Sequence, residues 1–301
     1  MISLGFFFAG PFLYLAIAVF ICVTTYKIIA FLRMPRPLRW ELYPLPHRGP
    51  VGSKYQKVDF HQQKAPFFLI NELLEMAAEI FFIKRLFSNN LRLWLGSYAL
   101  HGGLYLGVLW IILLATGAIF QINAAILNSI TIITGAAALI LGLTGSIYLL
   151  INRCVDPDLR AMSDAVSFLN LLLMIALFGS ALAAWLVADS SFNHLRIQVA
   201  GLMTFKPIAP YHPLITIELF FFGLFLIYLP FSRMLHFAAK CFFYHNIMWD
   251  DKAMKPGSKL ERERLKELAY HLQWAAPHIK TDRSWLEQVT GEQAKAGAKS
   301  E

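Results

Sequence analysis

Long apolar runs dominate the pattern of hydrophobic and polar positions along this chain. Each run is longer than the roughly 20 residues that a helix needs to cross the hydrocarbon of a bilayer. None alternates apolar and polar positions as the strands of a membrane barrel do. The pattern predicts an all-α integral membrane protein, a bundle of five transmembrane helices. The five runs are Gly5–Leu32, Leu93–Phe120, Ala125–Ile151, Ala161–Val187 and Pro213–Phe237.

Composition supports this prediction, because the chain is 57% hydrophobic and only 15% charged, with a mean hydropathy of +0.53. Soluble domains rarely reach such values. The first run is too long for the core of a signal peptide, and it has no basic region before it and no small-residue cleavage site after it. We therefore expect it to be a retained membrane helix.

The basic residues predict the orientation of the bundle. Ten Lys and Arg lie between the first two runs and eleven follow the last run, whereas the loop between the second and third runs has none. The loop between the fourth and fifth runs has only Arg196 and Lys206. Cytoplasmic loops carry the excess of basic residues. This distribution predicts a multi-pass protein of the cytoplasmic (inner) membrane with its N-terminus outside and its C-terminus inside, and it speaks against a nucleic-acid partner despite the net charge of +8.

Two polar stretches divide the remaining chain. The first is an interfacial segment, residues 33–91, in which Phe67–Phe87 has glutamates at helical spacing and is expected to be an amphipathic helix at the membrane surface. The second follows a membrane domain of residues 1–248 and forms a cytoplasmic tail, residues 249–301. The tail is short for an independent core. Its Trp274 and Trp285 therefore favour docking on a partner, the alternative being that they rest at the lipid headgroups.

Two histidines, His101 and His236, lie inside apolar runs on different predicted helices. His101 is nine residues past Arg92, or about 13–14 Å along its helix. The two depths agree if the last helix continues past Lys240, and the pair could then bind one haem iron from both faces. Arg233 could bind a haem propionate, or it could reach the headgroups instead. Hydrogen bonds to backbone carbonyls would equally explain the buried imidazoles.

Glycines Gly96, Gly102, Gly103 and Gly107 leave part of the second predicted helix without bulk. Such a surface would give clearance to a flat macrocycle, and close packing between helices would also explain it. The three cysteines are scattered and form no C-x-x-C motif, which argues against an iron–sulfur cluster or a covalently attached haem in this chain. A redox chain that passed through it would have to continue in another subunit.

Four segments give the chain a likeness to a known family: Arg39–His47 (RWELYPLPH), Ser97–Leu106 (SYALHGGLYL), Pro230–His236 (PFSRMLH) and Trp274–Thr281 (WAAPHIKT). With the helix order, they resemble the membrane cytochrome b family of the respiratory nitrate reductase gamma subunit. The likeness is greater to the membrane subunits of heterodisulfide-reductase-like redox complexes of sulfate reducers and methanogens. The resemblance implies one haem b, with His101 and His236 as its axial ligands.

The chain departs from the nitrate reductase pattern at the second haem, whose ligand positions hold Ile111 and Glu218 here. Neither is a usual ligand of haem b, so the resemblance does not extend to a second haem at that site. Glu218 could be a protonated residue tolerated near the outer face. It could also accept a proton from a quinol, menaquinol or another, bound where that haem is missing, with His212 nearby.

These inferences predict an electron-transfer subunit that is not catalytically complete alone. It would move electrons between membrane quinone and a cytoplasmic iron–sulfur subunit of the heterodisulfide-reductase type. The resemblance also allows further membrane or periplasmic cytochrome subunits. The alternative is a haem-free membrane anchor for a peripheral catalytic subunit. A transporter is disfavoured, because the sequence has no inverted repeat and no pair of broken helices.

Overall fold

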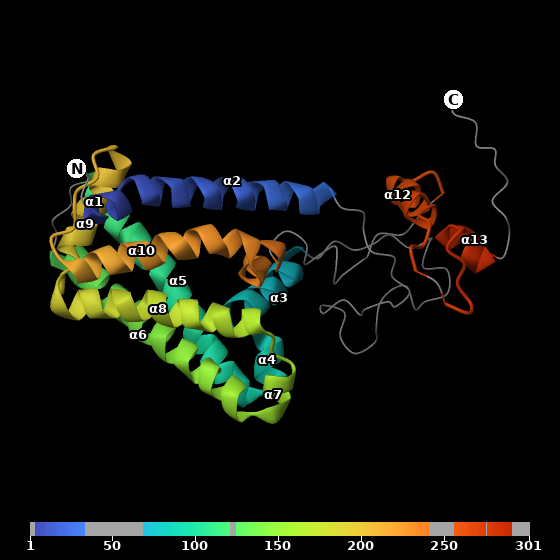
Figure 1. The fold of residues 1–301 in the computed structure, drawn as a ribbon, viewed down its shortest axis with the longest axis horizontal. Helices are drawn as coiled ribbons and strands as arrows, with labels where there is room; N and C mark the ends of the chain where they lie inside the picture. The colour runs from blue at the N-terminus through green and yellow to red at the C-terminus, as the bar shows by residue number, and fades with distance from the viewer. Residues whose placement is uncertain (1–3, 34–68, 121–124, 241–255, 275, 291–301) are drawn as a thin grey trace. The chain divides into compact units, whose positions relative to one another are not determined.

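The computed structural model describes residues 4–33, 69–120, 125–240, 256–274 and 276–290 (Figure 1). The described part is helical, apart from two isolated β-bridges in the tail. Contacts along the chain divide it into two units, one of residues 1–26 with 77–237 and the other of residues 27–76 with 238–301. The first contains the helical bundle, which is called the membrane unit below.

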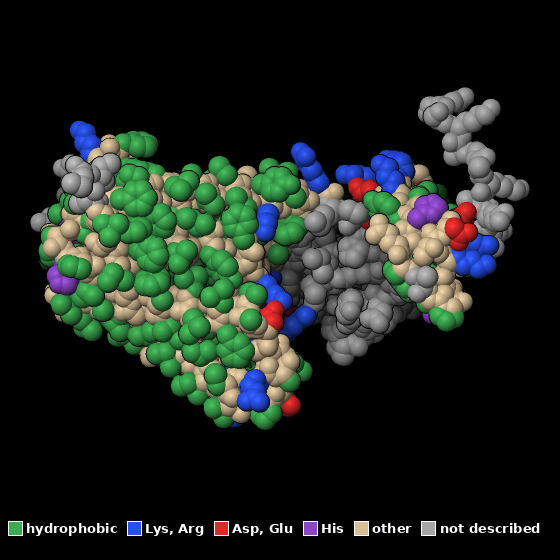
Figure 2. Space-filling view, viewed as in Figure 1, with side chains coloured by type: hydrophobic (Ala, Val, Ile, Leu, Met, Phe, Trp, Pro, Cys, Tyr) green, Lys and Arg blue, Asp and Glu red, His purple; other side chains and the backbone are tan. Residues whose placement is uncertain are grey.

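Five helices are long and apolar enough to cross a membrane, which confirms the predicted architecture. The first span joins α1 (Leu4–Ala9) to α2 (Pro11–Arg33), and the next three are α5 (Leu91–Phe120), α6 (Ala125–Val155) and α8 (Ala165–Val187). The fifth span, Pro213–Phe231, begins with α10 (Pro213–Tyr228). Hydrophobic side chains cover the face of the bundle that Figure 2 shows. An apolar outer surface is what lipid requires, so the chain is a multi-pass membrane protein.

Packing within the membrane unit follows the order of the spans. Helix α5 lies along α6, α6 along α8 and α8 along α10, while α1 lies against α10 (Figure 1). Glycines allow α5 and α6 to approach closely. A Cβ atom on Gly103 would lie 2.4 Å from the backbone nitrogen of Gly142, and one on Gly145 would lie 2.3 Å from that of Leu100. Small residues at such contacts bring backbones close enough for strong van der Waals packing.

Short helices occupy the loops of the bundle. Helix α9 (Asn193–Met203) lies between α8 and α10 in sequence and packs against α5. Helix α7 (Pro157–Ala161) follows α6, and α8 then begins after Asp164. The Asp164 carboxylate accepts a hydrogen bond from the Ser167 N–H at 2.9 Å, which caps α8. The predicted fourth span therefore starts four residues later than the apolar run that marked it.

The predicted amphipathic helix Phe67–Phe87 is two helices, α3 (Leu69–Phe81) and α4 (Lys84–Asn89). They are separated at Ile83, whose φ of 50° places it in the left-handed region. Glu79 is buried, and its carboxylate accepts a hydrogen bond from the backbone N–H of Arg85 at 3.1 Å. The position of α3 at a membrane surface stays a prediction.

The last apolar run is interrupted, whereas one helix had been expected. After α10 come two 3-10 turns, η4 (Leu229–Phe231) and η5 (Arg233–Leu235), before helix resumes over residues 236–240. Pro230 has no N–H for a helical hydrogen bond. Ser232 then takes an extended conformation, and its hydroxyl accepts a hydrogen bond from the N–H of Met234 at 3.1 Å. The break changes the direction of the chain immediately before His236.

The tail is more ordered locally than its length predicts. Helix α12 (Lys259–Leu268) starts at the Ser258 cap, and α13 (Trp285–Thr290) is held by a hydrogen bond from the Trp285 N–H to the Tyr270 carbonyl at 3.0 Å. Trp274 remains 53% exposed, whereas Trp285 is half-buried. The predicted boundary at residues 248 and 249 and the segment Trp40–His47 lie outside the described residues, so both stay predictions.

Candidate functional site

Two predicted site residues from different helices meet in the membrane unit. His101 lies on α5, and His236 follows the 3-10 turn η5 after the break in the last span. Their ring centroids are 6.0 Å apart, and the ring planes make an angle of 66°. Residues 135 positions apart in sequence therefore lie close together, in an edge-to-face arrangement, as the pairing predicted from the sequence requires.

Each ring is oriented by a backbone carbonyl. The Nδ1 atom of His101 lies 2.7 Å from the Ser97 carbonyl oxygen, and that of His236 lies 3.1 Å from the Arg233 carbonyl oxygen. A carbonyl can only accept, so Nδ1 must donate in both bonds and Nε2 must carry the lone pair of the neutral ring. Histidines that bind metals almost always have this arrangement, because the bond fixes the tautomer and the ring orientation. The same bonds are those of the alternative explanation, in which each ring is satisfied by a backbone carbonyl without a metal.

The separation of the rings fits two axial ligands of one metal. Metal–imidazole bonds are about 2 Å long. Two rings bound on opposite sides of one ion therefore have their bonding nitrogens about 4 Å apart and their centres roughly 6 Å apart. The observed 6.0 Å agrees with this value. His101 is half-buried and His236 is exposed, so the pair is not sealed inside the protein. The residues present therefore fit an iron porphyrin, the group that the sequence implied.

The four glycines of α5 were explained either by close packing between helices or by clearance for a flat macrocycle, and the structure shows two of them in each situation. Gly96 and Gly103 lie in close contacts with α6, because an added Cβ would come within 2.3 Å of Tyr148 and within 2.4 Å of Gly142. Gly102 and Gly107 border open space, because nothing lies within 4 Å of an added Cβ. Helix packing thus accounts for the first two, and the other two leave room on the surface of α5.

Arg233 makes an ion pair in the structure. Its Nη2 atom lies 2.7 Å from the Oδ2 atom of Asp164, while the Oδ1 atom of Asp164 caps α8. Both side chains are well exposed, at 74% and 42%. Hydrogen bonds from Ser167 and then the charge of Arg233 hold the pKa of Asp164 below its usual range. Arg233 therefore ties the start of α8 to the turn before His236, and its role at a haem propionate stays a prediction.

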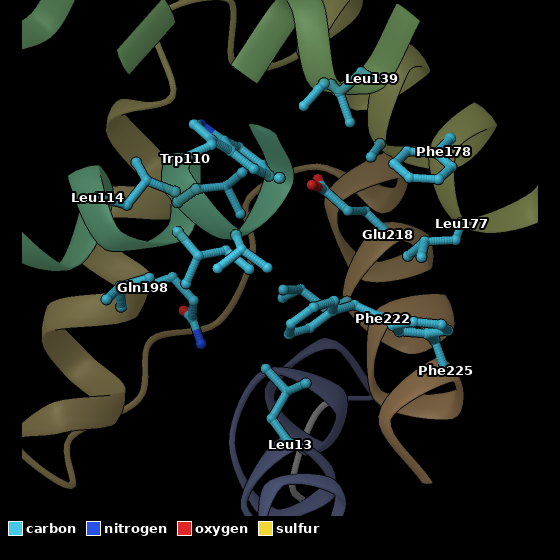
Figure 3. A pocket seen from close by; sticks show the side chains of 18 of the residues that line it. Leu13, Trp110, Leu114, Leu139, Leu177, Phe178, Gln198, Glu218, Phe222 and Phe225 are labelled. Carbon is cyan, nitrogen blue, oxygen red and sulfur yellow. The ribbon is translucent and has the colours of Figure 1, made fainter. Parts of the chain in front are cut away.

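A cavity of about 200 Å³ lies farther along the same two helices (Figure 3). Its lining is almost entirely apolar and includes Ile111 and Leu114 of α5 with Phe222 and Phe225 of α10. Glu218 is also part of the lining. Both positions that differ from the resembled family, Ile111 and Glu218, thus border one hollow. Clefts of this character, largely apolar with a few polar groups, are typical of binding sites for small molecules.

Glu218 is an acidic group without a partner among the residues that the structure describes. Its side chain is 6% exposed and makes no hydrogen bond or ion pair there. Figure 3 shows its carboxyl group directed into the cavity, and the oxygen atoms are not sealed from it. Buried polar groups almost always have a hydrogen-bonding partner. The arrangement therefore favours a ligand or water that bonds to this carboxyl group.

The cavity begins close to the histidine pair. Leu104 and Gly107 both line it, and they follow His101 on α5 by three and six residues. At 1.5 Å per residue they lie about 4.5 and 9 Å along the helix from His101. A molecule in the cavity would therefore lie close to any group bound by the histidines.

His212 is not among the residues that line the cavity. It lies at the start of α10, where its Nδ1 atom accepts a hydrogen bond from the Leu214 N–H at 3.2 Å. This bond caps the helix, which gives His212 a local structural role. Its predicted role in quinone binding stays a prediction without support from its position.

Two polar residues near the cavity were not singled out from the sequence. Gln198 on α9 lines it, is 1% exposed and donates a hydrogen bond to the Ala9 carbonyl at 2.6 Å. Asp189, between α8 and α9, is 7% exposed and accepts a hydrogen bond from the Leu195 N–H at 3.0 Å. Asp189 could have been noticed as an acid only two residues after an apolar run. Gln198 gives no comparable signal, since a glutamine in a loop is ordinary.

The chain matches no established protein family, and no curated protein is similar enough to count as its relative.

Proposed function

We propose that the chain is a haem b-containing membrane subunit of a redox complex, related to the cytochrome b family that its sequence resembles. It transfers electrons between membrane quinone and a cytoplasmic iron–sulfur subunit of the heterodisulfide-reductase type. The neighbouring histidines carry this proposal. Their 6.0 Å separation and their carbonyl-bonded Nδ1 atoms are the features of an axial ligand pair.

His101 and His236 would hold the haem through Nε2, and the bound iron would supply one-electron transfer. The carbonyls of Ser97 and Arg233 keep both rings in the binding tautomer. The break at Ser232 places His236 opposite α5, a position that a straight continuation of α10 would not guarantee. Both imidazole rings are thus oriented before a haem binds.

The cavity supports the quinone part of the proposal. Quinones of membranes have an apolar tail and a polar ring, which suits an apolar hollow with a carboxyl group in its wall. Oxidation of a quinol releases two protons with two electrons, and Glu218 is placed to accept a proton from a hydroxyl group. The rim at Leu104 and Gly107 is near His101, so electrons would have a short distance to cover.

A visible absorption spectrum tests the proposal most directly. The purified chain should give the reduced-minus-oxidised difference spectrum of a b-type cytochrome. His101→Ala and His236→Ala should each abolish it while the protein still inserts into the membrane. His271→Ala, in the tail, is the matched control and should leave the spectrum unchanged. A colourless parent protein would favour the haem-free anchor instead.

Filling the cavity tests the quinone site separately. Gly107→Leu adds a side chain at a lining position, where open space surrounds the present glycine. It should weaken binding of a short-tailed quinone analogue, measured by titration calorimetry. Gly179→Leu is the control, because it adds the same side chain on α8, where an added Cβ would meet only the Leu143 side chain at 3.8 Å, at a position that is not part of the cavity lining. Equal affinity in parent and Gly107→Leu proteins would contradict the proposed site.

A further inference from the structure

A group of ionisable side chains connects the cavity with the end of the bundle where α9 lies. Glu218 lines the cavity, five residues into α10. Asp189 lies in the turn between α8 and α9, and its carboxylate accepts a hydrogen bond from the N–H of Leu195, a residue that lines the cavity together with Glu218. His194 precedes Leu195 on the first turn of α9, so it lies beside the bond that holds Asp189. Asp189 is thus an intermediate between a cavity acid and a histidine.

The two carboxylate oxygens of Asp189 have different surroundings. Its Oδ2 atom accepts the hydrogen bond from the Leu195 N–H at 3.0 Å, which holds the start of α9. Its Oδ1 atom has no partner among the described residues and is not sealed from solvent. The residue as a whole is nonetheless 7% exposed. One carboxylate oxygen thus holds the start of α9, while the other is free to bond to a water molecule.

The two ring nitrogens of His194 lie in different environments, one buried and one accessible. Its Nε2 atom is buried and has no partner in the part of the chain that the structure describes, whereas Nδ1 is not sealed. The ring packs edge-on against the exposed Tyr211, with centroids 4.8 Å apart. Burial lowers the pKa of His194, and the charge of Asp189 opposes this only in part. The ring is therefore neutral at pH 7 and able to accept a proton.

We propose that Asp189 and His194 carry protons between Glu218 and the surface of the bundle at α9. The proposal rests on the proposed function, in which a quinol in the cavity is oxidised. The two quinol hydroxyls give their protons to Glu218 in turn, and the two electrons would pass one at a time to a haem held by His101 and His236 and from there to the iron–sulfur partner. One quinol becomes one quinone, two protons leave through Asp189 and His194, and two electrons leave through the partner.

Arg196 is the other charged group of this helix that is nearby, and it is not part of the route. It is two residues from His194, about 200° around the helix. Its Nη1 atom donates a hydrogen bond to the Asn128 side chain of α6 at 2.6 Å, and its shaft lies beside Gly117 of α5. Its charge therefore faces α5 and α6.

Hydrogen–deuterium exchange of the Glu218 carboxyl group tests the route without any turnover. A carboxylic-acid infrared band that disappears in Glu218→Gln is first assigned to Glu218, at a pH where it is present. Membranes are then mixed rapidly with deuterated buffer. Asp189→Asn should slow the shift of this band on the order of a hundredfold, the size of a lost proton-transfer group. An amide oxygen can still accept from the Leu195 N–H, so the start of α9 should be retained.

Asp164→Asn is the matched control, because Asp164 caps α8 as Asp189 holds α9, but at the end of α8 away from the cavity. It should leave the exchange rate unchanged. His194→Phe should slow exchange as well. If Asp189→Asn exchanges as fast as the parent, protons reach Glu218 directly through the cavity and the route is overturned.

Quinol-driven haem reduction then separates failure of the route from failure of the function. With both correct, Asp189→Asn should bind the quinone analogue normally and reduce its haem slowly, with a changed pH profile. A parent chain with haem and analogue binding, but with Asp189→Asn unaffected, overturns the route alone. A parent chain without haem overturns the proposed function and the route with it.

Discussion

Adjacent glycines on α5 allow a sharp test of how the bundle is packed. A methyl group on Gly103 would lie 2.4 Å from the Gly142 nitrogen, 2.6 Å from its Cα and 2.9 Å from the Ala138 carbonyl oxygen. All three are backbone atoms of α6, so no side chain can rotate away and the helices must separate. A methyl group on Gly102 meets nothing within 4 Å. The same substitution at neighbouring residues should therefore have opposite effects.

The magnitudes follow from two competing terms. Overpacking of a core costs about 1–3 kcal/mol. Replacing a helical glycine by alanine returns about 0.5–1 kcal/mol. Gly103→Ala should therefore lower the free energy of unfolding by up to about 2.5 kcal/mol, and Gly102→Ala should raise it by up to about 1 kcal/mol. For a unit of this size, 1 kcal/mol corresponds to roughly 2–4 °C in Tm.

Thermal unfolding of the detergent-solubilised protein, followed by tryptophan fluorescence, measures both effects. Gly103→Ala should melt several degrees below the parent and Gly102→Ala at or slightly above it. A third variant, Gly145→Ala, should behave like Gly103→Ala, since its Cβ would lie 2.3 Å from the Leu100 nitrogen. Equal Tm values for Gly102→Ala and Gly103→Ala would refute the close contact of α5 with α6.

Three further predictions concern orientation, the tail and pH. Protease added to oriented vesicles should cleave the tail only from the cytoplasmic side, because 21 Lys and Arg, ten plus eleven, flank the first and last runs; cleavage from outside would contradict the orientation. Truncation after Asp251 should preserve the haem spectrum but release the iron–sulfur partner during purification, since Trp274 is exposed in the tail; undiminished co-purification would exclude the tail as the docking site. Because burial lowers the pKa of His194, the unfolded chain binds its proton more readily, and Tm should fall as the pH drops below about 6.5. His194→Phe should lessen this fall, and an identical pH dependence in the variant would show that His194 does not cause it.

The sequence was a reliable guide wherever one physical requirement dominates. The spans could be predicted because lipid demands long uninterrupted apolar helices, and all five runs are found as such helices to within a few residues, apart from the break in the last. The nearness of His101 and His236 was predicted from helical rise, about 1.5 Å of depth per residue, on the condition that the last helix continues past Lys240. The chain instead reaches His236 through two 3-10 turns, and the residues after Lys240 lie outside those that the structure describes.

Features that depend on tertiary packing could not be predicted in this way. The turns at Pro230 and Ser232 lie within the last apolar run, and the hydrophobic pattern of that run is equally consistent with a straight helix. The pairing of Arg233 with Asp164 joins residues 69 apart in the chain, and no local pattern indicates it. Cavity volume is likewise set by how α5, α9 and α10 fit together. Glu218 was recognisable as unusual, whereas the hollow beside it was not.

Under the proposed function, the positions of the acidic residues and of the histidine pair have a consequence for energy conversion. Asp189 and His194 lie at the α9 end of the bundle, and the loop that contains them is the one predicted to face outside. His236 lies beyond the other end of α10 and is followed in the sequence by the tail rich in Lys and Arg. Electrons that move toward the cytoplasm while protons leave outside separate charge across the membrane. Each elementary charge moved stores about 2.3 kcal/mol per 100 mV. The placement of Glu218 near one end of α10, with the histidines near the other, would thus make quinol oxidation electrogenic.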